Sequence, residues 1–414
     1  MPSPYRAVFA SPGARAFSAA GFIGRMSLSM TGIGVVTMMS QLNGRYGLAG
    51  ALAATIALSA ACFGPQVSRL VDRFGQRRVL RPATVVALAA VAGLLLCATL
   101  GMPDWTLFGF AAGIGCVPSV GAMVRARWAT VLSDRPELLH TAYSAESAFD
   151  EVCFIIGPIL SIGLSTVWFP AAGPLLAAMF LAGGVWWLTS QRATEPVPHP
   201  REHHTGGSAL GAHGLQVLVG TFVAIGAAFG SVDVVTVAFA ESLGHKPAAS
   251  WILAVFAVGS CLSGFAFGLL SPTGPIARRW LLGMAVMALS MIPLQLVGSL
   301  PVLAVALFVV GLAAAPTMVT TMALVEQHVP RAKLTEGMTW VSTGMAVGIA
   351  LGSFLAGWVV DIAGAGAGYA VPGVSGAVAV AVGVLGYRRL KPPVAKRGGT
   401  SGHEDRAAEE RYVA

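Results

Sequence analysis

Twelve runs of predominantly apolar residues account for most of this chain. Of its 414 residues, 55% are hydrophobic and only 11% are charged, whereas soluble domains carry about 25% charged residues. A run of about 20 apolar residues is long enough to cross a bilayer as a helix. The sequence therefore predicts an all-α polytopic membrane protein, with spans near 17–39, 47–69, 80–101, 105–130, 141–167, 170–190, 214–239, 248–270, 280–299, 301–327, 337–360 and 370–388.

The formal net charge of +8 follows the ends of these runs and forms no basic face. Lysine and arginine gather in loops on one side, as they do in cytoplasmic loops. Arg45 and Lys246 fall in loops on the opposite side, and Arg25 lies inside a run. We therefore expect both termini in the cytoplasm and no nucleic-acid partner. The excess of arginine over lysine, with abundant Ala and Gly, indicates a bacterial cytoplasmic membrane.

A polar stretch divides the chain into two halves of six runs. The predicted organisation is a cytoplasmic segment 1–16, a bundle 17–190, a linker 191–213, a second bundle 214–389 and a disordered polar tail 390–414. The linker contains His199, His203, His204 and His213 without a carboxylate or cysteine framework. We therefore predict a solvated connector and no metal site.

One loop, at 64–81, places six charges between the second and third runs. It contains the sequence Ser68-Arg-Leu-Val-Asp72-Arg73-Phe-Gly75-Gln-Arg77-Arg78. This sequence resembles the loop between helices 2 and 3 of major facilitator superfamily transporters, whose pattern is G-x-L-x-D-R-x-G-R-R. Ser68 stands where the family has glycine, a small residue for a small residue, and the acid, the glycine and the arginines match.

Two further segments echo each other across the halves. Ile156-Gly157-Pro158 and Leu351-Gly352-Ser353 lie roughly 200 residues apart, and the loop 268–279 ends in a second arginine pair without the acid. These echoes favour duplicated halves. Together with the resemblance, they imply the family fold of twelve transmembrane helices in two pseudo-symmetric six-helix bundles.

Ionisable residues inside the predicted spans are candidate functional groups, because burying a charge in hydrocarbon costs several kcal/mol. Arg25 lies about as deep as Asp150, so it is predicted to meet Glu146 or Asp150. Glu146 and Asp150 share one helix face, and Glu151 is turned away. We interpret these residues as a proton-coupling site. The alternative is a structural ion pair with Glu146 reaching the interface.

Other residues extend this hypothesis. Asp233, toward the outer end of the seventh span, is a candidate contact for a cationic substrate or proton, and the alternative is that it simply faces water. Glu326 and Glu336 are expected at solvated helix ends. Apolar lining of a central cavity is expected from the family fold, with candidates Met26, Met30, Met38, Met39, Phe222 and Phe229.

The family resemblance implies a mechanism. Asp72 would lock the cytoplasmic side by pairing with Arg125 or Arg127 and with the positive N-terminal end of the span 337–360. Gly157-Pro158 resembles an element of the family's antiporters, although Ser161-Ile162 replaces its paired glycines. The alternative for this pair is a plain proline kink in the fifth span. The family's helix 4 motif R-x-x-Q-G, which supplies the usual proton-relay arginine, is absent. Arg25 is therefore the arginine to consider for that role.

We expect a secondary active transporter that works by alternating access and exports lipophilic small molecules or drugs, with lipophilic cations among the candidates. It is expected to work as a monomer and to be driven by the proton gradient without a cofactor. The alternatives are proton-coupled uptake of a metabolite and a membrane sensor with the same fold. An enzyme is disfavoured, because the chain contains no Ser/His pair at a helix end, no phosphate-binding loop and no intramembrane metal constellation.

Overall fold

The computed structural model describes residues 4–43, 46–117, 119–198, 207–245, 248–270 and 274–390. Arg45, Lys246, the linker histidines His199, His203 and His204, and the predicted tail after residue 390 lie outside these ranges. All regular elements in the described ranges are helices.

The first half begins with a short helix and continues with longer ones. In the described ranges these are α1 (Pro4–Phe9), α2 (Ala14–Asn43), α3 (Tyr46–Phe74), α4 (Gln76–Thr99), α5 (Asp104–Ile114), α6 (Val120–Val131), α7 (Leu139–Val167) and α8 (Ala172–Ser190). The second half contains α9 (His213–Ser242), α10 (Ala248–Leu269), α11 (Ile276–Met291), α12 (Leu300–His328), α13 (Leu334–Ala363), α14 (Ala365–Gly368) and α15 (Ala370–Gly386). Short 3₁₀ helices at Pro136–Leu138, Arg192–Thr194, Ala209–Gly211, Ile292–Leu296, Arg331–Lys333 and Tyr387–Leu390 join or end them.

Eleven helical segments of the described chain are long and apolar enough to cross a membrane. The fourth predicted span, 105–130, differs from the prediction because it is divided into α5 and α6. Gly115 lies at the break, and a side chain there would overlap Ser59 and the backbone of Ala60 in α3. The break thus lets the backbone approach α3 closely, and the two short helices together occupy the place of one span.

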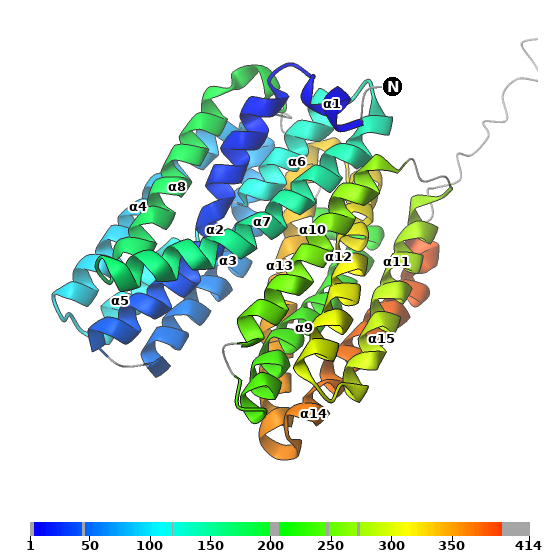
Figure 1. Cartoon of the computed structure of the whole chain (residues 1–414). Coiled ribbons are helices and arrows are strands. Elements are labelled where there is room, and N and C mark those ends of the chain that lie inside the picture. Colours follow the sequence, from blue (N-terminus) through cyan, green and yellow to red (C-terminus); the bar gives the residue numbers. More distant parts are fainter. Residues whose placement is uncertain are drawn as a thin grey trace, which may run out of the picture.

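The helices form two groups, one from each half of the chain. Figure 1 shows α2–α5 and α8 on one side and α9–α15 on the other, and the view from below keeps the halves side by side. The groups approach each other at the end near α1 and diverge toward the opposite end. The predicted arrangement of two helical bundles is therefore confirmed.

Glycines let paired helices come into close contact within each bundle. In the second half, Gly226 and Gly230 of α9 face backbone atoms of α13, and Gly348 and Gly352 of α13 face backbone atoms of α9. Small residues spaced by about four positions permit this approach between membrane helices. In the first half, Gly157 of α7 lies against α2 in the corresponding place. The corresponding segments around Gly157 and Gly352 thus each place a glycine at a close contact between two helices.

We expect Gly348→Val to destabilise the second bundle. A Cβ at this position would overlap the carbonyl oxygen of Val223 and also meet Ala227 N at 2.9 Å, both in α9. Overpacking of this kind costs about 1–3 kcal/mol. Thermal unfolding in detergent measures the effect, and Gly357→Val is the matched control, because a Cβ at Gly357 on the same helix meets nothing within 4 Å. Equal losses in the two variants would contradict the assigned close contact.

Candidate functional site

Two arginines and two acids form a charged cluster between α2, α6 and α7. Arg25 makes ion pairs with Glu146 and, at 2.7 Å, with Asp150. Arg125 of α6 pairs with the other oxygen of Asp150 at 2.5 Å. Both ion pairs anticipated for Arg25 are therefore present, and Asp150 joins the two guanidinium groups. Two positive and two negative charges balance within this cluster.

Glu146 occupies the buried side of the cluster. Its side chain is 0% exposed, and its Oε1 accepts hydrogen bonds from Ser18 Oγ and Trp128 Nε1, each at 2.7 Å. The alternative in which Glu146 reaches the interface is therefore wrong, because Arg25, Ser18 and Trp128 satisfy its oxygens in the interior. No sequence signal marked Ser18 or Trp128, since neither is ionisable.

Glu151 lies apart from the charged cluster, as its position on the helix predicts. Its Oε1 accepts a hydrogen bond of 2.8 Å from Ser260 of α10. Among the residues that the structure describes, no lysine or arginine forms an ion pair with it. Glu151 therefore connects the two bundles through a neutral partner, and its charge has no paired cation.

Asp233 and the Gly157-Pro158 pair complete the predicted intramembrane set. Asp233 is exposed on α9, and no hydrogen bond or ion pair joins it to another described residue. Pro158 lies within an uninterrupted α7. The Ser29 hydroxyl of α2 donates to Cys153 O at 2.8 Å, one turn before Gly157. Gly157 thus serves a close contact between α2 and α7.

We expect Arg25→Met to be strongly destabilising. The substitution leaves Glu146 fully buried without its cation, and breaking a buried pair in this way costs about 3–5 kcal/mol. The double variant Arg25→Met/Glu146→Gln removes both charges and should recover most of the loss, since Arg125 still neutralises Asp150. The midpoint of thermal unfolding in detergent measures both. A double variant no more stable than Arg25→Met would show that charge imbalance is not the cause.

Asp72 links the two bundles at the end of the molecule where α3 finishes and α13 starts. We term this end of the molecule the closed end. Asp72 Oδ2 accepts the Glu336 N–H at 2.9 Å, and its Oδ1 accepts the Thr335 N–H at 3.3 Å. These N–H groups belong to the first turn of α13, where they lack partners within the helix. Ser68 and Thr339 add a buried hydroxyl pair at 2.7 Å, which the glycine of the family pattern could not form.

Glu336 is buried at the centre of the closed end. It is 1% exposed, and the prediction of a solvated helix end is wrong for this residue. Its Oε1 pairs with Arg69 of α3 at 3.0 Å and accepts hydrogen bonds from Ser208 Oγ and from Trp340 Nε1 at 3.3 Å. These four groups come from both bundles and the linker, so Glu336 holds three parts of the chain together.

The predicted pairing of Asp72 with Arg125 or Arg127 is not observed. Arg125 is committed to Asp150, whereas Arg127 donates to Gln76 Oε1 at 2.7 Å and to Gln191 O at 2.9 Å. The two arginines are two positions apart on α6 and therefore face different neighbours. Of the partners predicted for Asp72, the N-terminus of α13 is the one that is observed.

The remaining loop residues shape the start of α4. Gly75 adopts φ 91°, a backbone conformation that favours glycine, and precedes the first turn of α4. The guanidinium of Arg73 lies 4.8 Å from the centre of the Phe74 ring. Arg77 and Arg78 line a surface pocket with residues of the linker.

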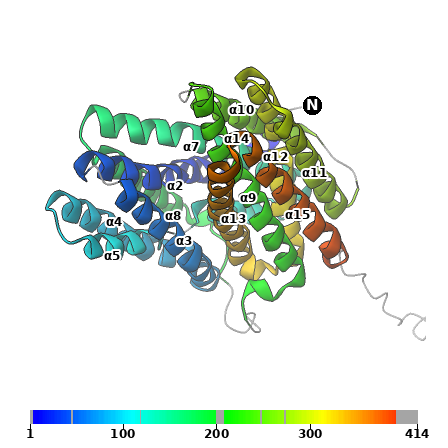
Figure 2. The ribbon, with the colours of Figure 1, turned by 90° about the horizontal axis from the view of Figure 1, so that it is seen from below.

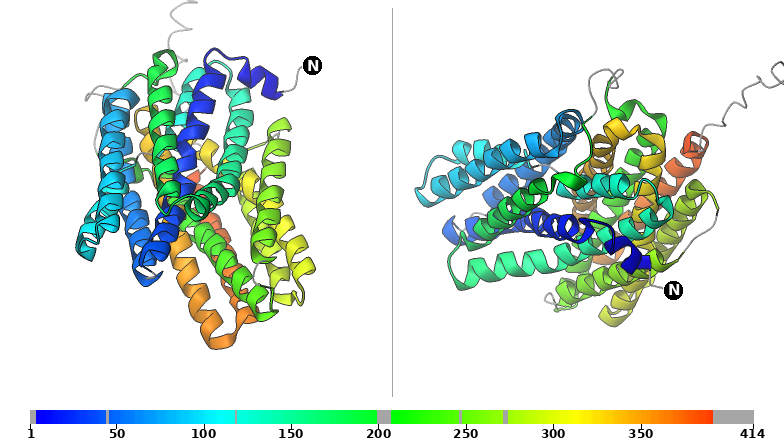
Figure 3. Two further views of the ribbon diagram at one scale, coloured as in Figure 1. Left: turned by 60° about the vertical axis from the view of Figure 1, so that its left-hand side comes forward. Right: turned by 90° about the horizontal axis from the view of Figure 1, so that it is seen from above.

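A second contact at the closed end joins the first bundle to the end of α10. The Tyr5 hydroxyl donates to Phe265 O at 2.7 Å, Thr141 Oγ1 donates to Gly268 O at 2.8 Å, and His140 Nε2 lies 2.8 Å from Phe267 O. Carbonyls near a helix C-terminus lack partners within the helix. Figure 3 shows α1 beside the second-half helices at this end. Burial raises the pKa of Tyr5 to about 12, so its hydroxyl stays a donor.

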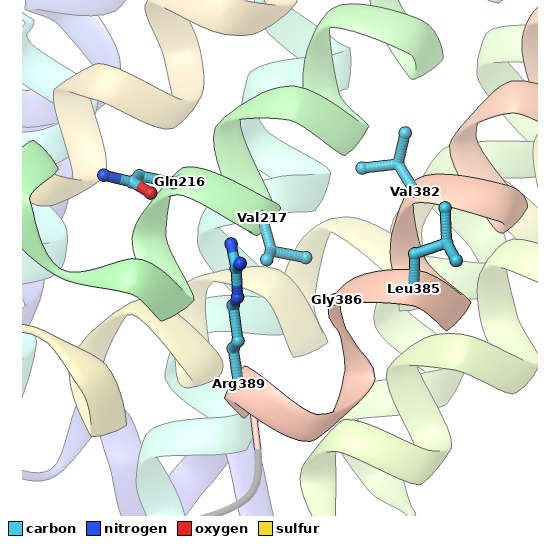
Figure 4. A pocket seen from close by; sticks show the side chains of 6 residues that line it. All are labelled: Gln216, Val217, Val382, Leu385, Gly386 and Arg389. Carbon is cyan, nitrogen blue, oxygen red and sulfur yellow. The ribbon is translucent and has the colours of Figure 1, made fainter.

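A separate groove of about 290 Å³ lies between α9 and α15. Figure 4 shows Gln216 and Val217 on α9, Val382 and Leu385 on α15, and Arg389 beyond the end of α15. It holds no acid and none of the predicted intramembrane residues. The methionines expected to line the central cavity, Met26, Met30, Met38 and Met39, are instead 0–4% exposed in the core, as is Phe222 at 1%.

The fold and its buried charges define a polytopic membrane protein built from two helical bundles. The sequence matches the family model of the Major Facilitator Superfamily over residues 17–245 and 217–410. The chain therefore belongs to this superfamily of transporters. No curated protein matches the sequence of this chain.

Solved transporters share the fold at low sequence identity. The human organic anion transporter MFSD10 (TETRAN) matches with a TM-score of 0.67 and 14% identity, over 91% of this chain and 99% of that one. A bacterial homologue of the iron transporter ferroportin, in an outward-facing state, matches with a TM-score of 0.67 and 13% identity, over 91% and 98%. The transporter FucP, in the outward conformation, matches with a TM-score of 0.66 and 12% identity, over 90% and 98%.

Proposed function

We propose that this chain exports lipophilic cations in exchange for protons across a bacterial cytoplasmic membrane. The observation that carries the proposal is the environment of Glu151, an intramembrane acid whose hydrogen-bond partner is the neutral Ser260 of the opposite bundle. A proton or a cationic ligand can each neutralise such a carboxylate, so the two compete for it. Competition for one site is the requirement of an antiporter.

The distribution of the other charges supports a cationic substrate. Arg25 and Arg125 are already neutralised by Glu146 and Asp150. Two intramembrane acids of the predicted site, Glu151 and Asp233, form no ion pair with an arginine or lysine among the described residues. An anionic substrate would meet uncompensated negative charge near them, and a cation would relieve it.

The contacts at the closed end support alternating access. The contacts of Asp72, Ser68 and Arg69 with α13, and those of Tyr5, His140 and Thr141 with α10, all cross between the bundles. Rocking of one bundle against the other would break them and open this end. We place the closed end and both termini on the cytoplasmic side, and the positive-inside pattern supports this orientation. On this assignment, the present arrangement faces outward.

The test uses purified protein in liposomes that contain a pH-sensitive dye. A panel of lipophilic cations, neutral drugs and small metabolites is added, and substrate-induced proton movement is recorded. Proton movement opposite to a lipophilic cation supports the proposal. Movement in the same direction as a metabolite would assign uptake instead, and silence across a panel that binds the protein would favour a sensor.

A further inference from the structure

A basic pocket of about 620 Å³ lies at the junction of α3 and α4, against residues 192–198 that follow α8. Arg77, Arg78 and Arg81 line it from α4, and Arg192 and Glu195 line it from the segment after α8. Four guanidinium groups therefore surround a hollow that contains one carboxylate. The charge balance of the pocket favours an anionic ligand.

The single carboxylate in the pocket is engaged with the protein itself. Glu195 Oε1 accepts the backbone N–H of Arg77 at 2.8 Å, in the first turn of α4. It also faces the buried Arg127. Burial raises the pKa of Glu195, and Arg127 opposes this shift. Glu195 thus holds the two walls of the pocket together, and its charge is shared with groups behind the pocket.

The pocket lies at the level of a membrane interface. Arg81 donates through Nε to Thr189 at 3.0 Å, near the end of the membrane-spanning α8, and its guanidinium lies 5.8 Å from the Trp186 ring. Trp186 and Trp187 are each 42% exposed, as aromatic side chains at the headgroup level are. Phe74 and Val197 add exposed apolar surface to the lining. A ligand here would meet cationic groups beside an apolar wall.

We propose that this pocket binds the headgroup of an anionic phospholipid, with its phosphate among the four arginines and its acyl chains beside Trp186 and Trp187. Phosphate pairs favourably with arginine, whose planar fork matches its oxygens. Basic pockets at the cytoplasmic ends of membrane helices bind the headgroups of cardiolipin and related lipids. The volume exceeds that of one phosphate group, so a headgroup with two phosphates fits the four arginines best. Such a lipid would hold the segment 192–198 against the start of α4.

The experiment measures lipid binding to the full-length protein by native mass spectrometry and by the thermal shift on adding lipid in detergent. Cardiolipin is compared with phosphatidylcholine, which has no net charge. The Arg78→Gln/Arg192→Gln variant is expected to lose at least about tenfold in cardiolipin affinity, because each arginine near such a headgroup contributes about 1 kcal/mol. Arg278→Gln/Arg388→Gln, which removes two exposed arginines of the other bundle, is the matched control and should bind as the wild type does.

The Arg78→Lys/Arg192→Lys variant keeps both charges and should retain most of the cardiolipin binding. It thereby distinguishes a loss of charge from a folding defect caused by substitution at these positions. Equal cardiolipin affinity in the wild type and the glutamine variant would overturn the proposal, as would an equal loss in the control. Inorganic pyrophosphate separates a lipid from a soluble anion. Stabilisation by pyrophosphate that depends on Arg78 and Arg192, without any by cardiolipin, would assign the pocket to a soluble phosphate instead.

Discussion

Glu151→Gln is expected to abolish substrate-driven proton movement in liposomes while leaving the protein folded. The amide keeps the size of the side chain and can still accept the Ser260 hydrogen bond, but it cannot exchange a proton. If Glu151 carries the coupled proton, the proton flux should fall by at least about a hundredfold, the scale of losing an essential acid or base. The pH-sensitive dye assay used with the identified substrate measures this directly.

The neighbouring acid gives the sharpest control. Asp150→Asn leaves Arg25 and Arg125 without a shared carboxylate, so it should lower the unfolding midpoint. Glu151→Gln breaks no ion pair among the described residues and should not lower it. Asp361→Asn removes an exposed acid from α13 and should change neither property. Undiminished proton flux in Glu151→Gln, with loss in Asp150→Asn, would move the coupling role to Asp150.

The sequence predicts the depth of these side chains better than their partners. Helical spacing correctly separates Glu151 from Glu146 and Asp150, because neighbouring residues point in different directions around a helix. It does not say which helix each face meets. Ser260 lies in α10, far along the chain and in the other bundle, and no feature of its surroundings marks a small polar residue as the partner of an acid.

The same limit explains the errors at the closed end. Hydrophobic length and arginine-rich loops predict the spans and the two halves, and the acid of the loop at 64–81 correctly indicates a contact with the start of α13. The sequence predicts that Arg125 or Arg127 pairs with Asp72, because both arginines lie at the cytoplasmic end of the fourth predicted span, on the same side as the loop at 64–81. Their side chains are instead drawn to Asp150 and to Gln76, which only the bundle geometry brings near.

The division of a span into two helices is also difficult to predict from amino-acid composition. The run 105–130 is apolar enough to read as one span, yet close contact of Gly115 with α3 accompanies its division into α5 and α6. Burial of Glu336 depends on two donors from other segments, Arg69 of α3 and Ser208 of the linker, in addition to Trp340 one turn along its own helix. Contacts of this kind depend on long-range packing, which a single sequence does not display.

Asp72→Asn is expected to shift the conformational balance away from the arrangement closed at this end. The carboxylate accepts two N–H groups at the positive N-terminus of α13, whereas an amide has one acceptor oxygen and presents N–H donors to the same site. The loss of a charge at a helix terminus and of one hydrogen bond amounts to about 1–2 kcal/mol. The population of the closed arrangement relative to the open one should therefore fall roughly 5- to 30-fold.

The Ser68 and Thr339 hydroxyls, 2.7 Å apart, provide the measurement. In a background without the five native cysteines, a Ser68→Cys/Thr339→Cys pair should form a disulfide rapidly under mild oxidant, because the closed end brings the positions together. Adding Asp72→Asn should slow cross-linking by the same 5- to 30-fold factor, and transport by the protein without the cysteine pair should fall with it. Asp361→Asn removes the same charge from an exposed site and should not affect cross-linking. An unchanged rate with Asp72→Asn would show that Arg69 and the contacts of Tyr5, His140 and Thr141 keep this end closed without the acid.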